Sequence, residues 1–144
     1  MGISDEIVIG ASEEDMHRDP YLSYLNRTTP LAMAQLFNRF DAEMRNTSLS
    51  YSEIATMLEQ CRTGIDRLVA PLLSSDATIG HKTGTGFPTP DGRISAINDC
   101  GYVNLPNGVR YSIAVFVADS GYDMAGTSAI IAEISIIVWI GLTG

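Results

Sequence analysis

The sequence is short of positive charge. Lysine and arginine together number 9 against 17 aspartates and glutamates, which gives a net charge of -8, and Lys82 is the only lysine. No run of basic residues offsets this balance, so the chain would repel a phosphate backbone or an anionic lipid surface. We therefore expect neither nucleic acid nor a membrane as a partner.

Cysteine is also scarce. Cys61 and Cys100 stand alone, with no second cysteine two or three positions away. This spacing excludes a zinc knuckle and a CxxC redox pair, so we expect no metal site. Solitary cysteines of this kind are most often small buried side chains, and we expect two free, buried thiols.

Two kinds of hydrophobic segment are missing. The chain does not open with a charged region followed by an apolar stretch, so no signal peptide is expected. The longest apolar stretch, 130–142, is interrupted by Glu133 and Ser135 and falls short of the roughly 20 residues that cross a bilayer. We expect a packed terminal helix over about 128–140, capped by Thr127, rather than a membrane span.

What is present suits one folded unit over residues 1–144. The hydrophobic fraction of 45% and the charged fraction of 18% are ordinary for a globular domain. Thr29 followed by Pro30 is typical of a helix start, because proline has no N–H to lose there. The apolar spacing that follows predicts a helix over about 30–40, and a second over about 51–60.

The second half of the chain predicts a sheet. Strand-like stretches cover about 78–85, 94–105 and 110–118. The last two are separated by Asn107-Gly108, a pair that favours the positive φ values of a tight hairpin. The apolar run 115–117 predicts a strand covered on both faces. The fold class is therefore α/β (α+β), with an antiparallel sheet of about three strands packed with helices.

A glycine-rich segment, 79–92, surrounds the single lysine. A phosphate loop needs glycine before the lysine, but His81 stands there. A dinucleotide fingerprint needs a third glycine where Thr89 stands. What remains is the KTG triplet at Lys82–Gly84, which recurs in class A β-lactamases and penicillin-binding proteins. On the triplet alone, a surface lysine in a loop is the more common explanation.

The surrounding motifs are more specific than the triplet, because several occur in order. They are ASEEDMH at 11–17, the segment 26–30, Thr63-Gly64 with Arg67-Leu68, HKTGTG at 81–86, Asn98-Asp99 and LPNG at 105–108. Over residues 2–139 the chain resembles the class A serine β-lactamases, and most closely their extended-spectrum subgroup. The resemblance places an Ω-loop at 10–20.

The resemblance implies hydrolysis of β-lactams through a serine acyl-enzyme, without a cofactor. It implies that Glu13 is the general base for the deacylating water and that His17, where many members have asparagine, helps to hold that water. Lys82 would supply positive charge, and the Thr85 N–H would form part of the oxyanion hole. The resemblance also implies a substrate-binding strand, in which hydroxyl groups contact the substrate carboxylate and glycines let it lie close: Thr83, Gly84, Thr85 and Gly86.

Two signature elements of that family are absent. The nucleophile lies in an SxxK motif, but three residues before the only lysine stands Ile79. Neither Ser4-Asp5 nor Ser75-Asp76 is followed by the asparagine of an SDN motif. The simplest interpretation is the C-terminal half of such an enzyme, with no nucleophile in this chain and no activity alone.

This interpretation implies a hydrolase of antibiotic resistance that is periplasmic or secreted when complete. Its partners would be a β-lactam substrate and a complementary N-terminal fragment. Two alternatives stay open: a non-catalytic remnant or complementing fragment, and part of a penicillin-binding transpeptidase. A transpeptidase lacks the Ω-loop base, so Glu13 in its acidic context argues against the second alternative.

Overall fold

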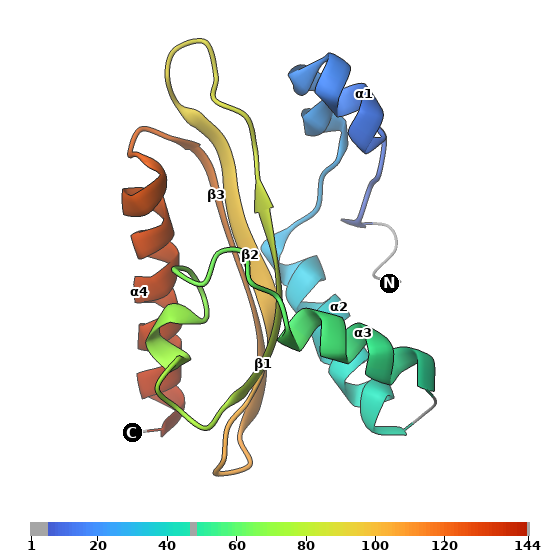
Figure 1. Ribbon diagram of the computed structural model, residues 1–144, viewed down its shortest axis with the longest axis vertical. Coiled ribbons are helices and arrows are strands. Elements are labelled where there is room, and N and C mark those ends of the chain that lie inside the picture. The colour runs from blue at the N-terminus through green and yellow to red at the C-terminus, as the bar shows by residue number, and fades with distance from the viewer. Residues whose placement is uncertain (1–5, 47–48, 144) are drawn as a thin grey trace.

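The computed structural model describes residues 6–46 and 49–143. A three-stranded sheet stands at the centre, with helices on both of its faces (Figure 1). Helices α2 and α3 cover one face, and α4 covers the other together with the turn segment that precedes β1. The predicted fold class, an antiparallel sheet packed with helices, is confirmed.

The sheet has the order β1-β2-β3, and both pairings are antiparallel. Its strands are β1 (Thr78–Thr85), β2 (Ile94–Asn104) and β3 (Arg110–Ser120), close to the predicted ranges. In the β2–β3 turn only Gly108 has positive φ, at 86°. The prediction for Asn107 is wrong, because its side chain accepts a hydrogen bond from the Val109 N–H in an ordinary backbone conformation.

Alternate residues of β2 and β3 face opposite layers, as expected for extended strands. Ile97, Ile113 and Val115 pack with Leu68 and Ile131 on the α4 side. Cys100 and Tyr102 pack with Phe37 on the other side, against which Phe116 also lies. The run 115–117 is therefore covered on both faces, as its continuous apolar character predicts.

Helix α2 (Pro30–Asn46) begins as predicted, because the Thr29 hydroxyl accepts a hydrogen bond from the Ala32 N–H at 3.1 Å. It runs past the predicted end at Phe40. The apolar face continues one turn further with Met44, which packs on the same cluster. Helix α3 (Leu49–Glu59) follows. Cys61, just beyond it, is half-buried rather than buried as expected, since it lies in a loop at the sheet margin.

Helix α4 (Met124–Thr143) is longer than predicted. Asp123 caps it by accepting a hydrogen bond from the Gly126 N–H at 2.7 Å. Thr127 is not the cap, because its hydroxyl is buried and bonds the Asp123 carbonyl and Ser120. At 20 residues α4 is long and apolar enough to cross a membrane by length and composition alone. In this structure one side of it packs on the sheet, through Thr127, Ser128, Ile131 and Ser135.

The predicted Ω-loop contains two short helices, α1 (Glu13–Arg18) and the 3-10 helix η2 (Pro20–Leu25). Ser12 and Asp15 form a capping box at the start of α1. The Asn26 side chain accepts hydrogen bonds from the N–H groups of Gly10 and Ala11 and so closes the loop at its base. Another 3-10 helix, η3 (Ala70–Leu72), precedes β1.

Candidate active site

The site is built on β1, which carries the KTG triplet. Lys82, Thr83, Gly84 and Thr85 pair with residues 97–100 of β2. Lys82 is exposed, and its ammonium group donates to the Thr83 carbonyl at 2.7 Å. The strand therefore presents a positive charge at its surface, and the hydroxyl groups of Thr83 and Thr85 point to the other side of the strand.

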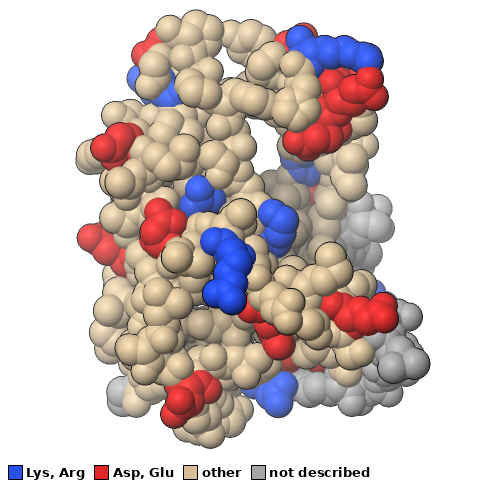
Figure 2. Space-filling view, in the orientation of Figure 1, with Lys and Arg blue, Asp and Glu red and all other residues tan. Residues whose placement is uncertain are grey.

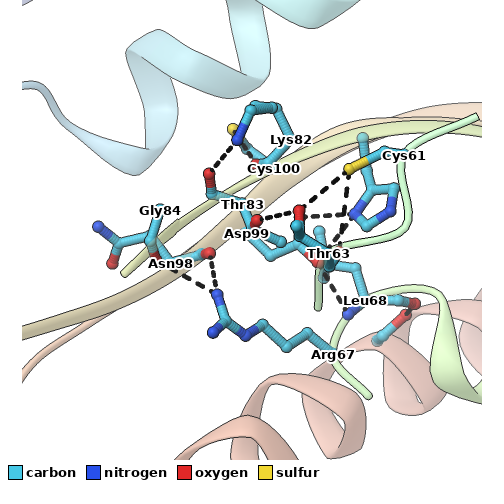
Figure 3. A network of polar contacts seen from close by, with 12 residues as sticks. Cys61, Thr63, Arg67, Leu68, Lys82, Thr83, Gly84, Asn98, Asp99 and Cys100 are labelled. Atoms are coloured by element: carbon cyan, nitrogen blue, oxygen red, sulfur yellow. Dashed lines mark hydrogen bonds and ion pairs between the residues drawn. The ribbon is translucent and has the colours of Figure 1, made fainter. Parts of the chain in front are cut away.

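Arg67 lies beneath this strand and is only 5% exposed. Its Nη1 donates to the carbonyls of Gly84 and Asn98, at 3.2 and 3.0 Å. Its Nη2 donates to the Thr85 hydroxyl at 2.9 Å. All of these oxygens are neutral, so the guanidinium charge is held by dipoles; Figure 3 shows Arg67 beside Gly84 and Asn98.

The segment before Arg67 lies along β1. The hydroxyls of Thr63 and Thr83 are 2.7 Å apart and share a hydrogen bond. Gly64 has φ of 61°, and a Cβ there would stand 2.5 Å from the Thr83 Cγ2 atom. Only glycine allows this approach, so the Thr63-Gly64 pair fixes the orientation of Thr83.

Below the strand His81 and Asp99 form a buried pair, 2% and 0% exposed. His81 Nδ1 lies 2.9 Å from Asp99 Oδ1, and Asp99 Oδ2 accepts from the Leu68 N–H at 3.2 Å. Burial alone would lower the pKa of His81, but the hydrogen bond and charge of Asp99 raise it above its ordinary value. The Asp99 carboxylate of β2 thus connects to β1 through His81 and to the turn segment through Leu68.

The backbone of Thr85 lies at the end of β1. Its neighbour Gly86 donates its N–H to the Ala96 carbonyl of β2 at 2.7 Å. Because successive N–H groups of a strand point in opposite directions, the Thr85 N–H points away from β2. This is the direction that an oxyanion-hole donor on the open edge of β1 requires.

The two glycines that flank Thr85 differ. A Cβ at Gly86 would stand 2.2 Å from the Ser95 hydroxyl, so β2 itself requires glycine there. A Cβ at Gly84 would meet only ordinary contacts at 3.9 Å. Among the described residues, therefore, no neighbour requires glycine at position 84. The resemblance implies that substrate lies close to the strand there.

The three consecutive acidic residues of α1 make different contacts. Asp15 accepts from the Ser12 N–H and hydroxyl in the capping box, and Glu14 pairs with Arg18. Glu13 lies 3.6 Å from His17 Nε2, and its side chain is 81% exposed. Of the three acids, Glu13 is the one held only by His17, which keeps its carboxylate accessible to solvent.

Glu13 and the β1 residues lie on opposite sides of an opening (Figures 1 and 2). A cavity of about 400 Å³ lies between the N-terminal segment and the sheet, lined by residues 7–9, 26–28, 96, 98, 116 and 118. Among residues 6–46 and 49–143, no hydrogen bond or ion pair joins Glu13 to β1. The lining of this cavity comes from the N-terminal segment, β2 and β3, and includes neither Glu13 nor a residue of β1.

Sequence reasoning gave no role to Arg67, His81 or Asp99, although all three lie in quoted motifs. Arg67 stands in a stretch that turns apolar at once, as RLVA. A lone arginine that begins a buried apolar run is a signal of a bonded guanidinium, since such a charge is rarely buried unpaired.

Comparison with known proteins settles the family. The model of the β-lactamase enzyme family matches residues 6–141. The chain belongs to this family. A β-lactamase of Phocaeicola vulgatus is 39% identical over 132 residues, which are 91% of this chain and 41% of that protein.

Two solved structures agree with this assignment. The extended-spectrum β-lactamase TLA-3 is similar with a TM-score of 0.90 and 36% identity, over 99% of this chain and 53% of its own. A representative class A β-lactamase from Bacteroides cellulosilyticus has a TM-score of 0.86 and 36% identity, over 97% and 51%. Class A β-lactamases are thus similar over nearly the whole chain, which spans about half the length of these relatives.

Proposed function

We propose that this chain is the KTG-bearing half of a serine β-lactamase that hydrolyses β-lactam antibiotics through an acyl-enzyme. The observation that carries the proposal is the arrangement on β1, which bears Lys82, Thr83 and Thr85, and where the buried guanidinium of Arg67 donates to the Thr85 hydroxyl. A lysine, two hydroxyls and an outward amide suit an anionic substrate whose carbonyl oxygen becomes negative during attack.

In this mechanism the Thr83 and Thr85 hydroxyls bind the carboxylate of the β-lactam. Lys82 and Arg67 supply positive charge from opposite sides of the strand. The Thr85 N–H stabilises the oxyanion as the serine adds to the carbonyl carbon and the lactam C–N bond breaks. Glu13, with His17, then takes a proton from water so that hydroxide attacks the acyl ester and releases the serine.

In this proposal the nucleophile lies outside these 144 residues, because their sequence contains no SxxK motif. A complementary N-terminal fragment would place its serine in the hollow between α1 and the sheet. The chain alone is inactive. When complete, the enzyme works in the periplasm or outside the cell, where antibiotics of this class are met.

The test is reconstitution. The chain is mixed with the segment of the Phocaeicola vulgatus relative that precedes the matched region, provided that it carries SxxK and SDN, and hydrolysis of a chromogenic β-lactam is measured. We expect no hydrolysis by either polypeptide alone and hydrolysis by the mixture. Covalent acylation of this chain alone, detected by mass spectrometry, would contradict the proposal.

The two alternatives give different results in the same assay. A non-catalytic remnant would bind the complementary polypeptide without any acylation. A transpeptidase half would acylate and then stay acylated, since it has no base to activate water. Turnover that depends on Glu13 separates the β-lactamase from both.

A further inference from the structure

Helix α1 carries Glu13 but has little hold on the rest of the molecule. None of its residues is buried. The hydrogen bonds of this loop lie within 10–26: Gly10 and Ala11 donate their N–H groups to Asn26, the capping box joins Ser12 and Asp15, and Arg18 donates to Glu14. These bonds fix the shape of the loop, but they do not reach the sheet.

One ring contact crosses from α1 to the β1–β2 loop. The rings of His17 and Phe87 lie edge to face, with centroids 6.1 Å apart and an interplanar angle of 73°. This geometry is in the favourable range for aromatic pairs. The backbone at Phe87 is held by β2, because its carbonyl accepts a hydrogen bond from the Ser95 N–H at 3.2 Å and the next residue, Pro88, forms a β-bridge with Ile94.

The same histidine reaches Glu13. His17 lies four residues after Glu13, so the two side chains share one face of α1, with His17 Nε2 3.6 Å from Glu13 Oε1. A ring that fixes His17 therefore also limits the positions open to the Glu13 carboxylate. Phe87, in turn, follows directly after the Thr85-Gly86 end of the KTG strand.

Beside this ring contact, the α1–η2 segment and the β1–β2 loop are not closely packed. A cavity of about 140 Å³ lies beside the contact, between η2 and the loop, lined by residues 20, 21, 23, 24, 87–90 and 95. Tyr21 and Tyr24 border it and remain mostly exposed, at 61% and 53%. Truncation of Phe87 would enlarge this space without bringing another side chain against His17.

We propose that Phe87 is a positioning residue for the general base: through His17 it holds Glu13 at a set distance from the KTG strand. Its role belongs to deacylation, because only that step needs Glu13 to orient a water. The proposal rests on the function proposed above. Phe87 itself contacts no reacting atom.

The test compares Phe87→Ala with Phe87→Tyr, which keeps the ring, and with Tyr21→Ala, which removes an aromatic from the same cavity without touching His17. Each variant is mixed with the complementary polypeptide, and acylation and deacylation rates are measured by rapid quench and mass spectrometry. We expect Phe87→Ala to slow deacylation about 10- to 100-fold while acylation is unchanged, because small misplacement of a catalytic group is costly. Phe87→Tyr and Tyr21→Ala should deacylate like the parent chain.

Hydrogen exchange of residues 11–19, measured by mass spectrometry on the dilute chain alone, gives an independent result. Faster exchange in Phe87→Ala than in Tyr21→Ala is expected. Unchanged exchange, or acylation and deacylation that fall together, would overturn the positioning role. If the parent mixture fails to acylate, the proposed function is wrong, whereas the exchange result still decides whether Phe87 holds α1.

Discussion

Arg67 shows how one residue joins several parts of this molecule. Its guanidinium bonds β1 through Gly84 and Thr85, β2 through Asn98, and the α4 layer through Ser128. The planar fork reaches oxygens in several directions at once, which a lysine ammonium on a flexible stem cannot do. The orientation of Thr85 therefore depends on arginine at this position.

We predict that Arg67→Lys lowers the free energy of unfolding by about 1–3 kcal/mol, because buried acceptors lose their donors. The control is Arg93→Lys, which changes an exposed guanidinium that pairs with Asp91 at 3.3 Å. Exposed pairs of this kind contribute about 0–1 kcal/mol, so the control should change little. Urea unfolding measures both, and equal losses would contradict the role given to Arg67.

His81 gives the stability a pH dependence with a definite sign. Burial opposes its charge, but the hydrogen bond and the charge of Asp99 raise its pKa in the folded chain above the ordinary value. The group binds its proton more tightly when folded, so its contribution is fully present below the unfolded pKa and is lost as pH rises through the folded pKa. We predict that the urea midpoint falls as pH rises from about 6 to 8. His81→Gln should lack this component of the pH dependence, and an unchanged profile would exclude His81 as its source.

The two cysteines provide an internal comparison. Cys61 is half-buried, and although desolvation opposes it, the hydrogen bonds from Thr63 lower its pKa below the ordinary value. For Cys100, burial and then the charge of Asp99 raise the pKa to about 12. Because the thiolate is the reactive form, we predict that iodoacetamide modifies Cys61 in the folded chain and leaves Cys100 intact. Peptide mapping by mass spectrometry distinguishes the two, and prior modification of Cys100 would contradict the burial described here.

At the scale of elements, the sheet could be predicted almost residue by residue. Turn chemistry at 105–108 and β-branched stretches are local signals, and they placed β2 and β3 within two residues of their ends. Helix ends were less certain. Met44 continues the apolar face of α2 past Phe40, and Asp123 caps α4 four residues before Thr127. Both facts depend on what the helix packs against.

The roles given to the candidate site residues stay predictions, although the sequence alone places several of them on one strand. A motif at fixed spacing identifies Lys82, Thr83 and Thr85, because neighbours along a strand stay together in any fold. Contacts such as Arg67 with Thr85 or His17 with Phe87 join residues far apart in sequence. They depend on tertiary packing, so a single sequence gives no local signal for them.

One side of helix α4 packs on the sheet. Its other side is also apolar and is exposed in the described part of the structure. Ile131 is fully buried in the sheet core, whereas Ile137 is 69% exposed. We predict that Ile131→Ala lowers the free energy of unfolding by about 2–4 kcal/mol, the range for buried aliphatic truncation. Ile137→Ala should change it by less than about 0.5 kcal/mol. Urea unfolding of the two variants tests the orientation of α4, and a reversed order would contradict it.

At the scale of the whole molecule, apolar side chains remain exposed on several elements. They include Met57 of α3 at 73%, Ile137 and Ile140 of α4 at 69% and 58%, and Leu31 of α2 at 64%. Within the described residues β1 and β3 each pair only with β2, so neither edge of the sheet has a partner strand. Soluble proteins rarely leave such surfaces uncovered, because they promote association.

These surfaces agree with a chain that spans about half the length of its relatives. A complementary polypeptide would cover apolar helix faces, pair with a free strand edge and bring a serine to the hollow beside β1. The central claim is therefore that the nucleophile lies in the half of the family's fold that these residues do not span, whereas the KTG strand and the base lie in the half described here.

The most direct test is a time course of covalent acylation in the mixture of the two polypeptides, followed by intact-mass spectrometry with a β-lactam. With the unchanged chain, we predict a transient adduct on the complementary polypeptide and none on this one. With Glu13→Gln we predict that the same adduct forms and persists, because water is no longer activated. An adduct on this chain, or equal decay of the adduct with Gln at position 13, would contradict the account.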